Sequence, residues 1–236
     1  MENNVFYKRE LIPDCNKIEP NKLNDDGLKA FIDMYPWYQS FDFGNGITVK
    51  GTHNSMEDID KVLIEDMKGM RYLDIGSNQG FQVLSAAMRG AAAYGIDNKI
   101  KQITMAKIIA KYFGIKADFT LIDVFDAKHK YIQYHNGFDY ISMMSVFHHF
   151  KKPKEALRIV RGMSNGVMMG EFCIYTDDNK NKWSKADKFP EDWKKEYHKT
   201  FPTIDCIVNE LKAVYSRVEV IGPLKVAHRI LIKSTV

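Results

Sequence analysis

The stretch LDIGSNQG, from Leu73 to Gly80, decides the fold of this chain. An apolar run with an acid near its end passes into a turn whose two glycines, Gly76 and Gly80, stand four residues apart, and a helical pattern follows. In doubly wound sheets such a turn lies at the carboxyl end of a strand, where missing side chains let a ligand approach the backbone. The stretch therefore predicts a ligand site at the end of a buried strand.

The spacing of the turn also restricts the ligand. A dinucleotide fingerprint requires glycines at positions 76, 78 and 81, whereas Asn78 and Phe81 occupy two of them. The close-packed pyrophosphate turn is therefore disfavoured. Asp74 instead suits a ligand with an ammonium group, which a carboxylate can bind directly or through water.

Short apolar runs alternate with helical periods from Arg71 to Tyr175, which predicts βαβ units and a parallel sheet covered by helices. The runs are YLDI, AYGI, DFTLI, FDYISMM and GVMMGEF. Two more strands are predicted at Arg217 to Ile221 and Ala227 to Ile232, separated by a Gly-Pro pair. We therefore predict an α/β fold.

Acids end the second and third of these runs. Asp97 follows Asp74 by one strand, helix and strand, where a carboxylate can accept both hydroxyls of a ribose. Asp123 ends the next run and can accept from an adenine amino group while Val124 or Phe125 covers the ring. The alternative for each acid is a helix cap or a solvated loop position.

The amino-acid composition restricts the classes of protein to which this chain can belong. The chain has 236 residues, of which 45% are hydrophobic, so it can fold around one core without disulfides or metals. Three separated cysteines, no long apolar run and a polar start predict reduced thiols, no membrane span and a cytoplasmic protein. The net charge of +4 comes with two local basic faces, residues 98–117 and 150–161, whereas residues 176–212 are neutral. The charge pattern does not demand nucleic acid.

The runs DIGSNQG, YGID, LIDVF, FDYISMMSVFHHF and VEVIGPLKVAHRILI together resemble class I S-adenosylmethionine-dependent methyltransferases, from about Arg71 to the C-terminus. The resemblance implies a Rossmann-like, doubly wound, seven-stranded and mostly parallel sheet with a C-terminal antiparallel hairpin. It also implies S-adenosyl-L-methionine as the cofactor. Asn78 departs from the common glycine pattern. The implied cofactor-binding residues are Asp74, Gly76, Ser77, Asn78, Gly80, Asp97, Asn98, Asp123, Val124 and Ser145.

Residues 1–69 are predicted to form an N-terminal extension that caps the substrate, and residues 70–236 the methyltransferase domain with an insert at about 176–215. The extension has predicted helices at Asp25 to Met34 and Met56 to Met67, and a hairpin turn at residues 44–46. Its segment from Pro36 to Gly51 resembles the lead-in of tRNA wobble-uridine carboxymethyl-transfer enzymes. Gln39 stands where those enzymes carry a lysine for a carboxylated cofactor, which favours ordinary S-adenosylmethionine.

To catalyse methyl transfer, an enzyme mainly has to position the methyl donor and the acceptor. A hydroxyl acceptor also needs a base that takes its proton. His148 and His149 follow the fourth run and are the predicted catalytic residues; the alternative is that they hold the loop. Trp37, Tyr38 and Glu171 are predicted to bind the substrate, although the aromatics can equally pack the core and Glu171 can cap a loop. Aromatic residues of the insert are a predicted lid or, alternatively, packing. No metal site is predicted.

Three functions are compatible with the sequence. A small hydroxylated acceptor is preferred, because a neutral, aromatic insert suits an enclosed pocket. Modification of RNA, in particular of a wobble-region uridine of tRNA, is the enzymatic alternative. A non-catalytic partner subunit with the same fold is the third, and the intact acids and glycines disfavour it.

Overall fold

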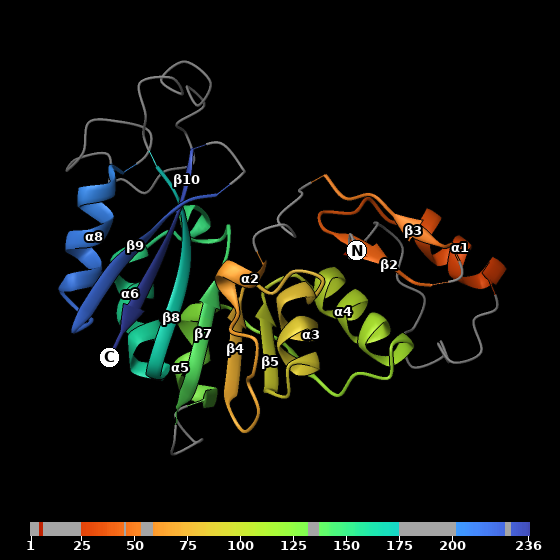
Figure 1. The fold of residues 1–236 in the computed structure, drawn as a ribbon, viewed down its shortest axis with the longest axis horizontal. Helices are drawn as coiled ribbons and strands as arrows, with labels where there is room; N and C mark the ends of the chain where they lie inside the picture. The colour runs from red at the N-terminus through yellow and green to blue at the C-terminus, as the bar shows by residue number, and fades with distance from the viewer. Residues whose placement is uncertain are drawn as a thin grey trace. The chain divides into compact units, whose positions relative to one another are not determined.

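The computed structural model describes residues 5–6, 25–44, 46–52, 59–131, 137–174, 202–224 and 228–236. The chain divides into two compact units (Figure 1). Unit 1 comprises Met1–Met70 and Ser77–Ile122, and unit 2 comprises Arg71–Gly76 and Asp123–Val236. Most of the predicted insert, including its aromatic residues Trp183, Phe189, Trp193, Tyr197 and Phe201, lies outside the described residues.

The main sheet has seven strands in the order β6-β5-β4-β7-β8-β10-β9. The strands are β4 (Arg71–Ile75), β5 (Ala92–Asp97), β6 (Asp118–Leu121), β7 (Phe138–Met143), β8 (Ser164–Cys173), β9 (Arg217–Pro223) and β10 (Arg229–Thr235). β5 pairs with β6, β4 with β7 and β7 with β8 in parallel, whereas β10 is antiparallel to β8 and β9. The predicted Rossmann-like, mostly parallel sheet with an antiparallel hairpin is confirmed.

Unit 1 contains two helices of the α/β pattern, α3 (Phe81–Met88) and α4 (Ile100–Tyr112). Eight of the thirteen residues of α4 are buried, and the exposed side chains include Lys107 and Lys111. The exposed residues of this helix are therefore Ile100 and two lysines.

The N-terminal part of unit 1 adds α1 (Asp25–Asp33) and a small sheet in the order β1-β2-β3 (Val5–Phe6, Ser40–Asp42, Thr48–Val49). The predicted hairpin is confirmed, since β2 and β3 pair in antiparallel register across residues 44–46. Aromatic rings hold this part to the end of α4: Phe43 stacks on Phe113 with ring centroids 5.5 Å apart and an interplanar angle of 10°.

The predicted helix at Met56 to Met67 is wrong at its C-terminal end. The described helix, α2 (Ile59–Val62), stops at Val62. The backbone N–H of Met67 donates instead to the carbonyl of Arg89 at 2.9 Å, and Asp66 accepts from the N–H of Lys68 at 2.9 Å. These contacts replace the helical hydrogen bonds that the apolar spacing had suggested.

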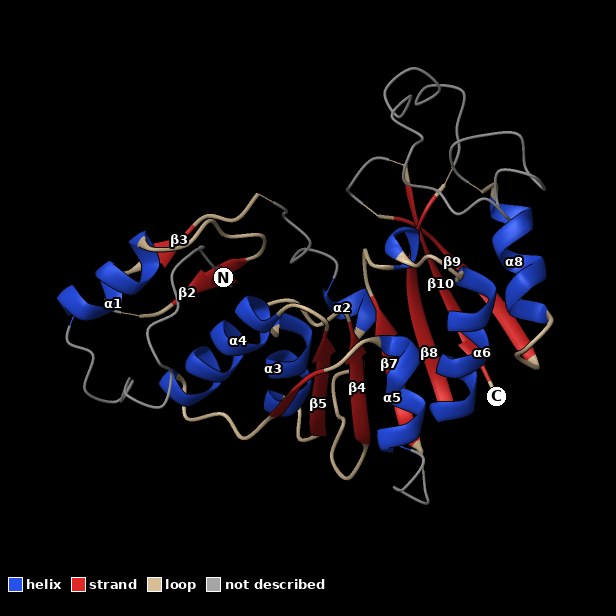
Figure 2. Cartoon of the chain, turned by 180° about the vertical axis from the view of Figure 1, so that it is seen from behind, coloured by secondary structure: helices blue, strands red, loops and turns tan. Residues whose placement is uncertain are grey.

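Unit 2 carries α5 (Val124–Tyr131), α6 (Pro153–Met163) and α8 (Ile204–Lys212), which lie on the viewer's side of its strands in Figure 2. α6 begins with Pro153, whose fixed backbone suits the first turn of a helix. A single 3-10 turn, η3 (Phe147–His149), follows β7. Within the described ranges, no helix has the length and apolar character that crossing a bilayer requires.

Candidate active site

The end of β4 is built from buried polar contacts inside unit 2. Asp74 is 2% exposed, and its Oδ1 accepts a hydrogen bond of 2.5 Å from Ser142 Oγ on β7. Ser142 Oγ also contacts the hydroxyl of Tyr72. The predicted ammonium-binding carboxylate is thus oriented by a neighbouring strand through a hydroxyl chain.

Gly76 follows in the left-handed region, with φ at 71°. A Cβ at this position would lie 2.6 Å from Cγ2 of Val146. Both facts require glycine here, which explains why the predicted turn begins with one.

The rest of the turn belongs to unit 1 and is tied to the end of β5. Asn78 has a φ of 50°, and its N–H donates to Asp97 Oδ2 at 3.0 Å. The other oxygen, Asp97 Oδ1, accepts from the N–H of Lys99 at 2.9 Å. Burial raises the pKa of Asp97, while the two backbone N–H groups oppose that rise by stabilising the carboxylate. Asp97 therefore organises the turn, and its predicted contact with the ribose hydroxyls remains a prediction.

Three buried polar atoms of this turn have no hydrogen-bond partner in the described part of the chain: Ser77 Oγ, Asn78 Oδ1 and Gln79 Oε1. Leaving such an atom unpaired costs about 1–3 kcal/mol. Their concentration in three consecutive residues marks a place where a polar ligand would satisfy them. Ser77 and Asn78 were predicted from the sequence, whereas Gln79 was missed.

Asp123 lies two residues beyond β6 and immediately precedes α5. Its Oδ1 accepts from the N–H of Phe125 at 3.1 Å, so it makes the capping contact that the sequence left as an alternative. Val124 is buried, and Asn98, directly after Asp97, is exposed. The predicted adenine and ribose contacts of these residues remain predictions.

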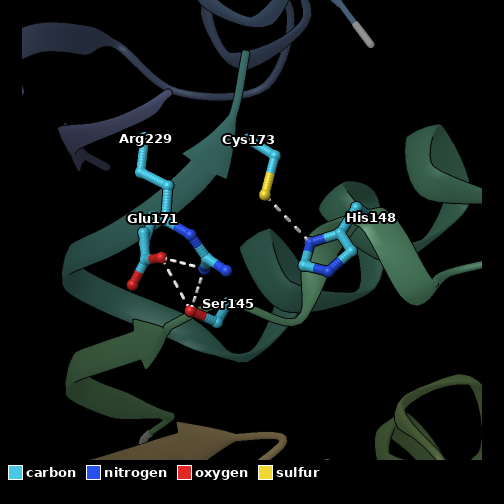
Figure 3. Close-up of polar contacts among 5 residues, drawn as sticks. All are labelled: Ser145, His148, Glu171, Cys173 and Arg229. Carbon is cyan, nitrogen blue, oxygen red and sulfur yellow. Dashed lines mark hydrogen bonds and ion pairs between the residues drawn. The ribbon is translucent and has the colours of Figure 1, made fainter. Parts of the chain in front are cut away.

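The loop after β7 carries a charged cluster within unit 2 (Figure 3). Ser145 adopts a φ of 54° and donates from Oγ to Glu171 Oε1 at 2.6 Å. Nη1 of Arg229 on β10 contacts both Ser145 Oγ and Glu171 Oε1. Glu171 is 3% exposed and Arg229 9%, so this is a buried ion pair.

Arg229 was not predicted as a functional residue. A sequence signal for it existed, because an arginine at the start of the apolar run of β10 requires a partner if it is buried. That partner is Glu171, the predicted substrate-binding acid, whose Oε2 points away from the guanidinium (Figure 3).

The predicted catalytic pair lies on η3, in the same loop. The ring centroids of His148 and His149 are 4.1 Å apart, with an interplanar angle of 44°. Nδ1 of His148 lies 3.4 Å from Sγ of Cys173, the buried residue at the end of β8. Burial raises the pKa of the Cys173 thiol to about 11, so the thiol is protonated at neutral pH. In the described ranges, no three His, Cys, Asp or Glu side chains gather as metal ligands would.

The predicted substrate-binding aromatics belong to unit 1. Trp37 is 4% exposed, its Nε1 donates to the carbonyl of Ile32 at 3.1 Å, and its ring meets Phe43 edge-on. These contacts match the packing alternative. Tyr38 is half-buried, and Gln39 Nε2 donates to Gln82 Oε1 at 3.1 Å.

Comparisons with known proteins agree with this geometry. Residues 66–213 match a family described as a methyltransferase domain. A ubiquinone biosynthesis O-methyltransferase from Chromobacterium violaceum is 27% identical over 113 residues, which cover 48% of this chain and 46% of that protein. The chain thus matches less than half the length of this relative.

Solved structures with low identity share the fold. Magnesium protoporphyrin IX methyltransferase from Synechocystis PCC 6803 with bound SAH has a TM-score of 0.59 at 15% identity, covering 79% of this chain and 90% of that one. The N-terminal domain of EvdMO1 with SAH has a TM-score of 0.66 at 13% identity, covering 91% and 98%. Because the family match spans more than half of the chain, the chain belongs to the methyltransferase-domain family, and it has the class I S-adenosylmethionine-dependent methyltransferase fold of these structures.

Proposed function

We propose that the chain transfers the methyl group of S-adenosyl-L-methionine to a hydroxyl or similar nucleophile of a small-molecule acceptor. The observation that carries this proposal is the group of unpaired buried polar atoms at Ser77, Asn78 and Gln79, next to the Asp97 carboxylate. Such atoms need a polar ligand. The family and the bound molecules of its structural neighbours suggest which one.

The residues that would hold the cofactor follow the strand ends. Asp74 and Gly76 lie at the carboxyl end of β4, Asp97 and Asn98 lie at that of β5, and Asp123 and Val124 follow β6. The remaining assigned residues are Ser77, Asn78, Gly80 and Ser145. When bound, the cofactor supplies a sulfonium-activated methyl group, so the protein has only to bind, orient and manage one proton.

The acceptor side is assigned to the loop after β7 and to the extension. One histidine of the His148 and His149 pair would take the proton from the acceptor hydroxyl. Glu171, Trp37 and Tyr38 would contact the acceptor, with residues 1–69 as a cap over the domain of residues 70–236. The names of the relatives, which refer to ubiquinone and to a porphyrin, support a small-molecule acceptor over RNA.

Calorimetric titration of the full chain tests the proposal. S-adenosylmethionine and S-adenosylhomocysteine are expected to bind at micromolar level, and a nicotinamide dinucleotide is expected to give no response. A screen of hydroxylated metabolites and of tRNA would follow, and a steep loss of tRNA affinity with salt would favour the RNA alternative. Absence of heat from both cofactor forms would overturn the proposal in favour of the partner-subunit alternative.

A further inference from the structure

The contact between Cys173 and His148 distinguishes the two histidines. We infer that Cys173 holds His148 in the tautomer that carries its proton on Nε2, so that His148 donates a hydrogen bond to the acceptor oxygen and His149 takes the acceptor's proton. Cys173 is then a positioning residue. The inference rests on the proposed methyl transfer and deepens it.

The first step concerns the thiol. Sγ of Cys173 and Nδ1 of His148 are 3.4 Å apart, within hydrogen-bond reach for sulfur (Figure 3). Burial is the main cause that keeps the thiol protonated; the Glu171 carboxylate acts in the same direction and Arg229 opposes it. A protonated thiol is a donor, and sulfur is a weak acceptor. The favourable arrangement is therefore S–H donating to Nδ1.

The second step concerns the imidazole. A neutral histidine has one protonated and one unprotonated ring nitrogen. When Nδ1 accepts from the thiol, the proton must be on Nε2. His148 then presents an N–H donor on the side of the ring away from Cys173, and that nitrogen has no lone pair with which to take a proton.

The third step concerns His149. Its side chain is exposed, whereas that of His148 is half-buried, and the ring centroids are only 4.1 Å apart. Two imidazolium charges at this separation repel each other, which favours one neutral ring beside one proton-accepting ring. Exposure lets His149 pass its proton to water after each turnover.

The chemistry balances without another reactant. The acceptor hydroxyl gives its proton to a ring nitrogen of His149, and an oxygen lone pair forms the bond to the methyl carbon. The sulfur–methyl bond breaks, and its electron pair neutralises the sulfonium. The imidazolium of His149 then releases the proton to solvent.

Charged groups lie on the same loop and on elements that contact it, and they contribute to the pH response of the pair. The Glu171–Arg229 ion pair of β8 and β10 acts on the Cys173 thiol, which contacts His148, and exposed Lys151 and Lys152 follow the pair on the chain. Asp123 precedes α5 and Asp126 lies in its first turn, and Phe125 of this helix contacts Phe150 edge-on. Variants that leave these groups unchanged are therefore the ones to compare.

Nitrogen-15 NMR of the imidazole rings in the full chain tests the inference without measuring activity. In the neutral form, His148 is expected to show an unprotonated Nδ1 and a protonated Nε2. Cys173→Ser should keep this signature because a hydroxyl also donates, and Cys173→Ala should give a mixture of tautomers. Cys206→Ala, at the second buried free cysteine among the described residues, is the matched control and should leave the tautomer of His148 unchanged. A wild-type His148 with its proton on Nδ1 would overturn the inference.

Activity against pH supplies the second readout. His149→Asn is expected to remove the acid limb of kcat, whereas His148→Asn should keep that limb and raise the acceptor KM about tenfold. Loss of the limb in His148→Asn instead would overturn the assignment. Failure of the proposed function would appear separately, as absence of cofactor binding in the wild-type protein.

Discussion

The turn Ser77 to Gly80 and the loop Ser145 to His149 handle their polar groups in opposite ways. In the turn, buried oxygens of Ser77, Asn78 and Gln79 have no partner among the described residues. In the loop, Ser145 contacts Glu171 and Arg229, and His148 contacts Cys173. The turn therefore leaves polar atoms that a proposed ligand would satisfy, whereas the polar groups of the loop are already paired within the protein.

This difference has an energetic consequence. An unpaired buried polar atom costs about 1–3 kcal/mol, so the turn weakens the free protein. A ligand that satisfies it returns stability, about 2.7 kcal/mol at a concentration one hundred times its Kd. The loop should respond much less to the cofactor, because its partners are side chains of the same unit.

Glu171→Gln should produce the largest loss of stability. It tests whether the loop depends on polar partners within the protein. Removing the carboxylate leaves the Arg229 charge buried without its counter-ion, and the expected loss in the free energy of unfolding is about 3–5 kcal/mol. Urea unfolding measures it. The double variant Glu171→Leu, Arg229→Met should recover most of the loss, since neither charge remains. A loss below about 1 kcal/mol in the single variant would mean that the pair behaves as a solvated surface contact.

Asp97→Ala should produce the next largest effect and tests the ligand-dependent turn. The change removes the acceptor for the Asn78 N–H and the predicted acceptor for the ribose hydroxyls. Affinity for S-adenosylmethionine is expected to fall at least about a hundredfold, or about 2.7 kcal/mol, in calorimetry. Asp118→Ala, at an exposed acid on the first residue of β6, should bind as the wild type does. Retained affinity in Asp97→Ala would refute the role of this residue.

Gly80→Ala separates the packing of the turn from its backbone conformation. Gly80 and Gly114 both have positive φ, at 89° and 64°, but a Cβ would lie 2.6 Å from the Phe119 ring at Gly80 and meets nothing within 4 Å at Gly114. Gly114→Ala should lose about 1–2 kcal/mol of stability from strain alone. Gly80→Ala should lose about 1–3 kcal/mol more from the overpacked ring. Equal losses would show that the ring moves aside freely.

Ser77→Ala and Ser145→Ala should produce the smallest effects, and they compare the turn with the loop directly. Removing the unpaired Ser77 hydroxyl should stabilise the free protein by about 1–3 kcal/mol, because the cost of the unpaired atom disappears, and should weaken cofactor binding a few-fold. Removing the Ser145 hydroxyl breaks two contacts and should cost about 1–2 kcal/mol in unfolding. If Ser77→Ala were less stable than Ser145→Ala, the proposed difference between the unpaired turn and the paired loop would be wrong.

Much of the fold was predictable because the spacing of apolar residues, and the glycines and prolines between them, indicate the strands and turns. The apolar runs YLDI, AYGI and FDYISMM became the parallel strands β4, β5 and β7. The predicted break at the Gly-Pro pair was wrong, because β9 includes Gly222 and Pro223, which pair with Leu231 and Ile230 of β10. α5 was not predicted, because its sequence VFDAKHKY has no clear apolar periodicity. Its helical conformation depends on the surrounding fold. The overlong helix at Met56 to Met67 was the converse error, because buried Leu63 and Met67 mimic a helical face.

By itself, the sequence determined the strand–turn–helix pattern, the glycine turn and the acids at the strand ends, because these depend on neighbours along the chain. Only the tertiary structure decided that Arg229 neutralises Glu171, that Asp74 is bound by Ser142, and that Cys173 faces His148. These partners come from different strands and loops, and which side chain meets which depends on sheet register and loop path. No pattern in the linear sequence encodes those pairings, so the charges and tautomers of the site follow from packing.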